Sequence, residues 1–193
     1  MRKPPVHSVL PILLLLALTL LAEAPTRSEH WARPISLAGV PNLYQVSDGI
    51  YRSAQPAAEG LRNLPGIGVQ RVLSLRQGEG DQSLADGLPL ALSHIEMSAW
   101  FIRDQDVIAA LRLLQDAQQA PILVHCRHGA DRTGVVCAAY RIVCQNWTIE
   151  EAIAEMVDGG FGYHKIFNNI RNYLKKLQVE KIRQELAEYN PPD

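Results

Sequence analysis

The chain has 193 residues, of which 47% are hydrophobic, and a formal net charge of −1. This length and apolar share suit one globular domain with its own hydrophobic core. The near-neutral charge gives no reason to expect a nucleic acid as partner, and an odd number of cysteines, three, argues against a framework of disulfides.

The first 24 residues have the pattern of a targeting segment. Arg2 and Lys3 form a short basic start, and an apolar run follows from Val9 to Ala22. A run of this length is typical of a secretory signal peptide and is shorter than the about 20 residues that span a bilayer comfortably. Residues 1–24 are therefore predicted to be a signal peptide or an N-terminal anchor. In a bacterium, the rest of the protein would be periplasmic or tethered to the periplasmic face of the inner membrane.

The next segment changes from polar to strand-forming. Residues 25–41 contain prolines and show no clear period, which predicts a linker before a domain that spans 42–180. Leu43–Val46 and Ile50–Arg52 flank a short turn that contains Gly49. This pattern predicts two strands joined as a hairpin.

Beyond the hairpin, apolar strands alternate with helical patterns. The predicted strands are 71–75, 90–97 and one that follows Pro121, and the predicted helices are 56–64, 104–118, 132–144, one from a capping box at Thr148 to Val157, and 163–179. Such alternation predicts a single α/β domain with a mainly parallel central sheet flanked by helices and an active loop at the carboxyl end of a strand. Residues 181–193 are predicted to be a C-terminal tail.

The most informative stretch runs from Pro121 to Gly134. An apolar strand leads to Cys126, and Arg132 follows Cys126 after five intervening residues. The strand brings Cys126 to the edge of the sheet, where loop N–H groups and the start of a helix near Arg132 form a hollow suited to a dianion. The same field favours the nucleophilic thiolate form of Cys126. A nucleophile beside an anion site predicts phosphoryl transfer.

The spacing His125-Cys126-x2-Gly129-x2-Arg132-Thr133-Gly134 resembles the signature loop of the cysteine-dependent protein tyrosine phosphatases. The wider likeness, from about Asn42 to Leu177, is to the compact dual-specificity branch, especially its bacterial exported members. The resemblance implies a compact dual-specificity phosphatase-like fold, a phosphocysteine intermediate, and no metal or cofactor. It also implies phosphotyrosine, and possible phosphoserine or phosphothreonine, as substrates.

Each residue of the loop then has an expected role. Cys126 attacks phosphorus, and the planar guanidinium of Arg132 binds two phosphoryl oxygens. The residues expected to bind substrate, mainly through backbone N–H groups, are Arg127, His128, Gly129, Ala130, Asp131 and Thr133. Thr133 could instead cap the helix, or donate its hydroxyl to the sulfur. Asp131, an anion beside an anion site, is expected to tether a neighbouring loop or Arg132.

This sequence departs from the pattern of the family at the general acid, the residue that protonates the leaving group. The loop that usually carries it, Ser98–Arg103, holds no carboxylate. Asp104 and Asp106 come next, and Asp104 is the preferred candidate because it is nearer to the loop, although it could simply be a helix N-cap. A third possibility is that no side chain protonates the leaving group, which would favour substrates with good leaving groups, such as aryl phosphates and pyrophosphates.

Alternative functions remain open at this point. The chain could hydrolyse inositol phosphates or another small phosphoester, with Arg76, Arg127 and His128 binding extra phosphates. The missing acid also allows an inactive module that only binds phosphorylated groups. A rhodanese-like sulfurtransferase or an arsenate reductase is disfavoured by the ending Arg132-Thr133-Gly134. The expected partners are a phosphorylated protein or a small phosphoester, no nucleic acid, and a possible membrane tether through residues 1–24; the oligomeric state is left open.

Overall fold

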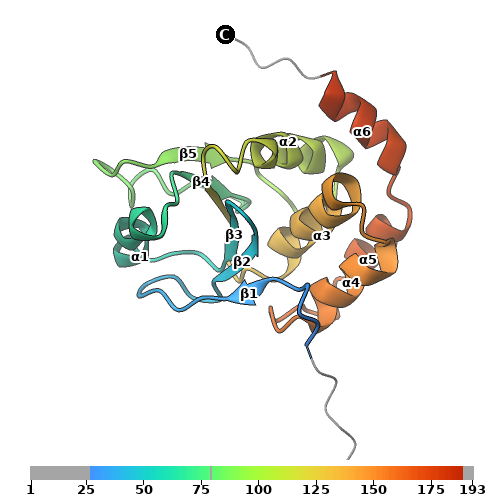
Figure 1. Ribbon diagram of the computed structural model, residues 1–193, viewed down its shortest axis with the longest axis horizontal. Helices are drawn as coiled ribbons and strands as arrows, with labels where there is room; N and C mark the ends of the chain where they lie inside the picture. Colours follow the sequence, from blue (N-terminus) through green and yellow to red (C-terminus); the bar gives the residue numbers. More distant parts are fainter. Residues whose placement is uncertain (1–26, 79, 189–193) are drawn as a thin grey trace, which may run out of the picture.

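A six-stranded mixed sheet forms the centre of the molecule (Figure 1). The structure, a computed structural model, describes residues 27–78 and 80–188, so the predicted signal peptide or anchor lies outside the described residues. The strands are β1 (Arg33–Pro34), β2 (Tyr44–Ser47), β3 (Ile50–Ser53), β4 (Arg71–Ser74), β5 (Ala91–His94) and β6 (Ile122–His125). Their order across the sheet is β1-β2-β3-β6-β4-β5.

Parallel pairing covers the half of the sheet that carries the site. β6 lies between β3 and β4 and is parallel to both, and β4 is also parallel to β5. The predicted hairpin is confirmed as the antiparallel pair β2 and β3, and β1 adds an antiparallel edge strand. The fold prediction of a single α/β domain therefore holds, with a mixed sheet.

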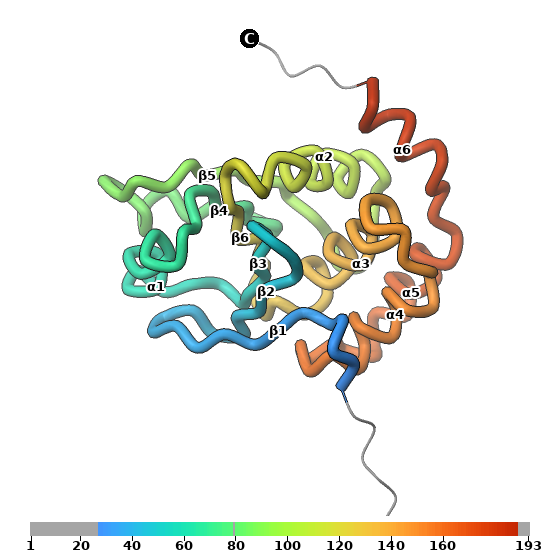
Figure 2. The backbone as a smooth tube through the Cα atoms, in the orientation of Figure 1, coloured from blue at the N-terminus to red at the C-terminus, as the bar shows by residue number. Residues whose placement is uncertain are grey.

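Helices cover both faces of the sheet. They are α1 (Ala58–Asn63), the 3-10 helix η1 (Leu64–Ile67), α2 (Asp104–Gln115), α3 (Asp131–Gln145), α4 (Ile149–Asp158), α5 (Asn168–Lys175) and α6 (Val179–Ala187). Figure 2 shows α1 on one side of the sheet and α3, α4 and α5 on the other. Within residues 27–78 and 80–188, no helix combines the length and the apolar character needed to cross a membrane.

The alternating direction of side chains along the strands explains why helices pack on both faces of the sheet. Leu73 and Val124 belong to the larger core, which the long helices share, whereas their neighbours Val72 and Leu123 belong to the smaller core beneath α1. Successive side chains of a strand point to opposite faces, so strands buried on both faces are apolar at every position. This is why the sequence of β6 is apolar without a gap up to His125.

The linker prediction is wrong for the described residues 27–41. This segment contains β1, whose Arg33 pairs with Gln45 of β2, and it buries Ala32 and Val40. The Ala32 N–H donates a 2.6 Å hydrogen bond to Glu155 of α4. These contacts join residues that are far apart in the sequence, so the local pattern of apolar residues did not indicate them.

The C-terminal predictions also need correction. The single helix predicted for 163–179 is a turn followed by α5, and a break precedes α6. Most of α6 lies in the segment predicted as a tail, and it packs against α2 and α3 through Ile182 and Leu186. These two side chains are four residues apart and so share one face of the helix, which is the face that the core buries.

Candidate active site

Cys126 lies immediately after β6, in the loop that leads to α3. The neighbouring strands end at the same level, because Ser53 of β3 and Ser74 of β4 both pair with His125. The Cys126 side chain is buried, with 1% exposure. The predicted arrangement of strand, loop and helix N-terminus is therefore confirmed, and residues 126–134 are called the signature loop below.

A hollow of about 430 Å³ opens at this loop. Its lining residues are Gln55, Arg76, Gln77, Arg127 and Arg132. Arg127 and Arg132 come from the signature loop, and Arg76 follows the end of β4. Arg132 also donates a hydrogen bond of 3.4 Å to the carbonyl of Leu75. Three guanidinium groups around one hollow next to a helix N-terminus make an anion-binding site.

Long-range contacts fix the shape of the signature loop. Gly129 adopts a φ of +72°, and a Cβ atom there would lie 2.5 Å from backbone atoms of Ser53 and Ala54. The Gly129 carbonyl accepts a 2.7 Å hydrogen bond from the buried Arg52. The His128 carbonyl accepts a 2.9 Å hydrogen bond from Asn42. Glycine adopts this backbone conformation without the steric cost that a side chain would add. Sequence reasoning included Gly129 in the motif, but it missed Arg52 and Asn42.

Asp131 tethers a neighbouring loop, which was one of the two predicted roles. One carboxylate oxygen accepts a 3.0 Å hydrogen bond from the His164 backbone N–H, and the other lies 2.8 Å from His164 Nδ1. Asp131 is buried and begins α3. The carboxylate therefore holds the segment after α4 against the signature loop.

The hydroxyl of Thr133 is buried and has no hydrogen-bond partner within the described part of the chain. It does not cap α3 through its side chain. An unpartnered buried hydroxyl is costly unless another state supplies its partner. In this conformation Thr133 therefore neither caps α3 nor donates to the sulfur of Cys126, and its hydroxyl is available to another partner.

Asp81 is a residue that sequence reasoning missed. It is buried in the loop after β4, and its Oδ2 lies 2.7 Å from His125 Nε2. His125 Nδ1 lies 3.3 Å from the Cys126 carbonyl oxygen, so His125 contacts the backbone of the loop. Burial alone would raise the pKa of Asp81, but the hydrogen bond and charge of His125, with the charges of Arg76 and His94, lower it overall. Only the order of strands in the sheet could have indicated this contact, because Asp81 follows a strand adjacent to β6.

Replacing Asp81 by Asn should destabilise the protein and slow the enzyme. Loss of a buried hydrogen bond to a charged group costs about 1.5–3 kcal/mol. The rate should also fall, because Asp81 holds His125, and His125 directly precedes Cys126 and contacts the Cys126 carbonyl oxygen. The measurement is urea unfolding together with turnover of p-nitrophenyl phosphate. Asp86→Asn is the matched control, because Asp86 is an exposed carboxylate in the same loop.

The destabilisation should depend on pH. Because the folded-state pKa of Asp81 is lowered, its stabilising contribution is fully present above the unfolded-state pKa of about 3.9. It is lost as the pH falls through the folded-state value. The difference in unfolding free energy between the wild type and Asp81→Asn should thus shrink below about pH 4. A difference that stays constant through this range would contradict the pairing.

Neither candidate for the general acid lies in the hollow. Asp106 is buried and forms two hydrogen bonds with Arg103, of 2.8 and 2.9 Å. Asp104 accepts a 2.9 Å hydrogen bond from the Tyr173 hydroxyl. The groove around Asp104 is also lined by Lys181 of α6 and by no residue of the signature loop. Cys126 and Arg132 belong to the signature loop, and Arg132 lines the hollow, whereas Asp104 lines a separate groove.

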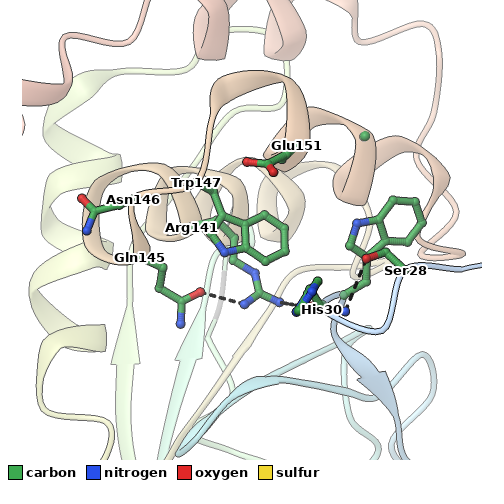
Figure 3. A pocket seen from close by; sticks show the side chains of 9 residues that line it. Ser28, His30, Arg141, Gln145, Asn146, Trp147 and Glu151 are labelled. Atoms are coloured by element: carbon green, nitrogen blue, oxygen red, sulfur yellow. Dashed lines mark hydrogen bonds between the residues drawn. The ribbon is translucent and has the colours of Figure 1, made fainter.

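A larger cavity, of about 790 Å³, lies elsewhere (Figure 3). It is lined by Ser28, His30 and Trp31, by the end of α3, and by the start of α4, with no residue of the signature loop. The guanidinium of Arg141 stacks 4.2 Å from the Trp147 ring and is paired with Glu155. Because its only buried charge is already neutralised, this cavity is not a second anion site.

Comparisons with known proteins agree with this geometry. Residues 40–190 match the profile described as "Tyrosine phosphatase family". The dual specificity protein phosphatase TpbA of Pseudomonas aeruginosa is 34% identical over 165 residues, which are 85% of this chain and 74% of TpbA. A crystal structure of a TpbA variant in complex with pTyr has a TM-score of 0.76 and 33% identity, and covers 85% of this chain and 100% of that one.

A second kind of relative also matches. The inositol diphosphatase DSP5 of Arabidopsis thaliana is 30% identical over 126 residues, which are 60% of this chain and 60% of DSP5. TpbA and DSP5 thus each share sequence with this chain, over 85% and 60% of its length.

Proposed function

Because the chain belongs to the tyrosine phosphatase family and is a cysteine-dependent phosphatase, we propose that it hydrolyses phosphotyrosine in proteins, with phosphoserine and phosphothreonine as further substrates. The observation that carries this proposal is the hollow lined by Arg127 and Arg132, which belong to the same loop as Cys126. TpbA, with pTyr bound in its crystal structure, supports the substrate class.

The reaction has two steps. Arg132 binds two oxygens of the phosphoryl group, and the Cys126 thiolate attacks phosphorus. The S–P bond forms while the bond from phosphorus to the leaving oxygen breaks. Water then attacks the phosphocysteine, inorganic phosphate is released, and the thiolate returns. Thr133 stabilises the departing sulfur through its free hydroxyl.

A row of aromatic rings that begins in the signature loop favours an aryl substrate. His128 of the signature loop lies 5.3 Å from His164 between ring centroids, and His164 lies 6.3 Å from Phe167. Phe167 in turn lies 4.7 Å from Trp100, which is 54% exposed. Phe101, beside Trp100, is 78% exposed. Such a surface can contact the ring of phosphotyrosine and apolar residues of a peptide.

Asp104→Asn tests whether this residue is the general acid. If it were, the variant would lose about 10²–10⁴-fold in rate and its acid-to-neutral pH profile would flatten. We expect an unchanged profile, because Asp104 contacts Tyr173 in a separate groove. The pH dependence of kcat/KM with a phosphotyrosine peptide decides between the two. An unchanged profile together with a strong preference for good leaving groups would fit catalysis without a side-chain acid.

Hydrolysis of inositol phosphates is the second candidate function. The observation that favours it is the third guanidinium, Arg76, which lines the same hollow as Arg127 and Arg132. Three cations suit a substrate with several phosphates. The test is a panel of phosphotyrosine peptide, phosphoserine peptide, inositol hexakisphosphate and an inositol pyrophosphate. The highest kcat/KM on the phosphotyrosine peptide supports the main proposal, and the highest value on an inositol substrate supports the second.

We also propose that the protein is exported to a bacterial periplasm or tethered to the inner membrane. The support is the basic start and the apolar run of residues 1–24. Fusing these residues to a reporter that folds only in the periplasm tests export. Fractionation of the full chain separates a released protein from a tethered one.

A further inference from the structure

Two histidines and one aspartate meet at the edge of the signature loop, and neither bond-forming step of the reaction uses their side chains. Asp131 is buried at the start of α3, whereas His128 in the loop and His164 after α4 are exposed. The nitrogen and oxygen atoms that these side chains offer all lie within 4.8 Å of one another. His128, Asp131 and His164 are called the rim triad below.

The rim triad is held in place before any ligand arrives. The Asp131 carboxylate binds both the backbone and the ring of His164, at 3.0 and 2.8 Å. The His128 backbone is fixed by the hydrogen bond from Asn42 to its carbonyl. The exposed His128 ring contacts the edge of the His164 ring, at 5.3 Å between centroids. Two of the three possible ligands are thus preorganised, which lowers the entropy cost of binding an ion.

We propose that the rim triad binds a transition-metal dication, above all Zn²⁺, and that the bound ion slows hydrolysis of phosphoesters. Two imidazoles and one carboxylate are the donors that zinc prefers, and this set of three protein ligands leaves a fourth position open. Magnesium and calcium prefer oxygen ligands and gain little from the histidines.

The geometry needs small adjustments to take the ion. Two ligands of tetrahedral zinc, each at about 2.0–2.2 Å from the metal, lie roughly 3.4 Å apart. The 2.8 Å pair of Asp131 and His164 must therefore open slightly, and His128 must turn toward it. The ion replaces the hydrogen between His164 Nδ1 and the carboxylate, and the ring then carries its hydrogen on Nε2.

Inhibition follows from the position of the site. His128 and Asp131 both belong to the loop that holds the phosphoryl group, next to Arg127 and Arg132 in sequence. The ion adds two positive charges there and offers its open position to an oxyanion. Phosphate released from Cys126 should leave more slowly when it can also bind the metal.

The first experiment measures binding without the catalytic thiolate. Cys126→Ser protein is titrated with Zn²⁺ by calorimetry and with Co²⁺ by visible absorption. We expect one ion per chain and a Co²⁺ spectrum without the sulfur charge-transfer band. Adding His128→Ala or His164→Ala should weaken binding by at least about tenfold. His30→Ala is the matched control, because His30 is exposed and lies at the other cavity.

The second experiment measures inhibition in chains that retain Cys126. Turnover of p-nitrophenyl phosphate is compared with and without Zn²⁺ within each variant, so a change in basal rate does not matter. The wild type should be inhibited, and the His128→Ala and His164→Ala variants should each need at least about tenfold more zinc. The binding measurement does not depend on the proposed substrate. The inhibition measurement requires only that the protein has phosphatase activity.

Three results would overturn the proposal. They are no binding to the Cys126→Ser protein, binding that survives His164→Ala, and equal zinc sensitivity of the wild type and both histidine variants. The third result would place the inhibitory ion on a cysteine instead.

Discussion

Cys126→Ser should remove turnover of p-nitrophenyl phosphate, by a factor on the order of 10⁴ or more. A serine hydroxyl is almost wholly protonated at neutral pH, so it is a far weaker nucleophile than the thiolate that it replaces. The helix N-terminus and the arginines of the hollow remain, so orthovanadate should still bind, as measured by calorimetry.

The matched control for this variant is Cys144→Ser, because Cys144 is an exposed free cysteine near the far end of α3, the helix that follows the signature loop. It should keep the wild-type rate. Turnover retained by Cys126→Ser would remove Cys126 from the mechanism. Loss of both turnover and vanadate binding would point instead to a collapsed loop.

Glu155→Ala should cost about 3–5 kcal/mol of stability, the loss expected when one partner of a buried ion pair is removed. Both side chains of the pair are 4% exposed, and Arg141 Nε and Nη2 lie 2.9 and 2.8 Å from the carboxylate. The same carboxylate accepts from the Ala32 N–H. The variant therefore leaves a buried guanidinium without its anion and frees the segment that carries β1.

Urea unfolding followed by tryptophan emission measures this effect. Trp147 stacks on the Arg141 guanidinium and so reports directly on the pair. Glu150→Ala is the control, because Glu150 is exposed on the same helix and should change stability by less than about 0.5 kcal/mol. A loss in Glu155→Ala no larger than that of the control would contradict a stabilising role for the buried pair.

The sequence predicted the signature loop well because its determinants are local. The apolar strand, Cys126, Gly129 and Arg132 lie within a few residues of one another, and each has a role that its own chemistry requires. Alternation of strands and helices was likewise enough to predict the α/β class and the position of the loop. The periodicity of apolar residues and the spacing of motif residues are properties of short stretches, so they can be recognised from the sequence alone.

Residues that act across the fold could not be predicted in this way. Arg52 lies in β3 and Asp81 in the loop after β4, and they contact Gly129 and His125 only because β3, β4 and β6 end side by side. The segments predicted as linker and tail are short of apolar residues, and they join the domain through a few buried positions such as Ala32 and Ile182. Such contacts depend on tertiary packing.

The position of Asp104 is the sharpest difference between expectation and structure. Closeness in sequence to the loop at Ser98–Arg103 favoured it as general acid, but the first turn of α2 directs it toward Tyr173. Asn169 of α5 also donates hydrogen bonds to the carbonyls of Ala99 and Trp100, which fixes that loop against the row of aromatic rings. Leaving-group dependence is therefore a more informative measurement than further search for a carboxylate by sequence alone.

Trapping the covalent intermediate tests the central claim most directly. The enzyme is mixed rapidly with p-nitrophenyl phosphate, and the reaction is quenched within one turnover. The protein is then digested, and the masses of the peptides are measured by mass spectrometry. The account predicts one added phosphoryl group on the peptide that contains Cys126, absent from Cys126→Ser. A phosphoryl group on another side chain, such as His128, would contradict it, as would product formation in a burst that leaves Cys126 unmodified.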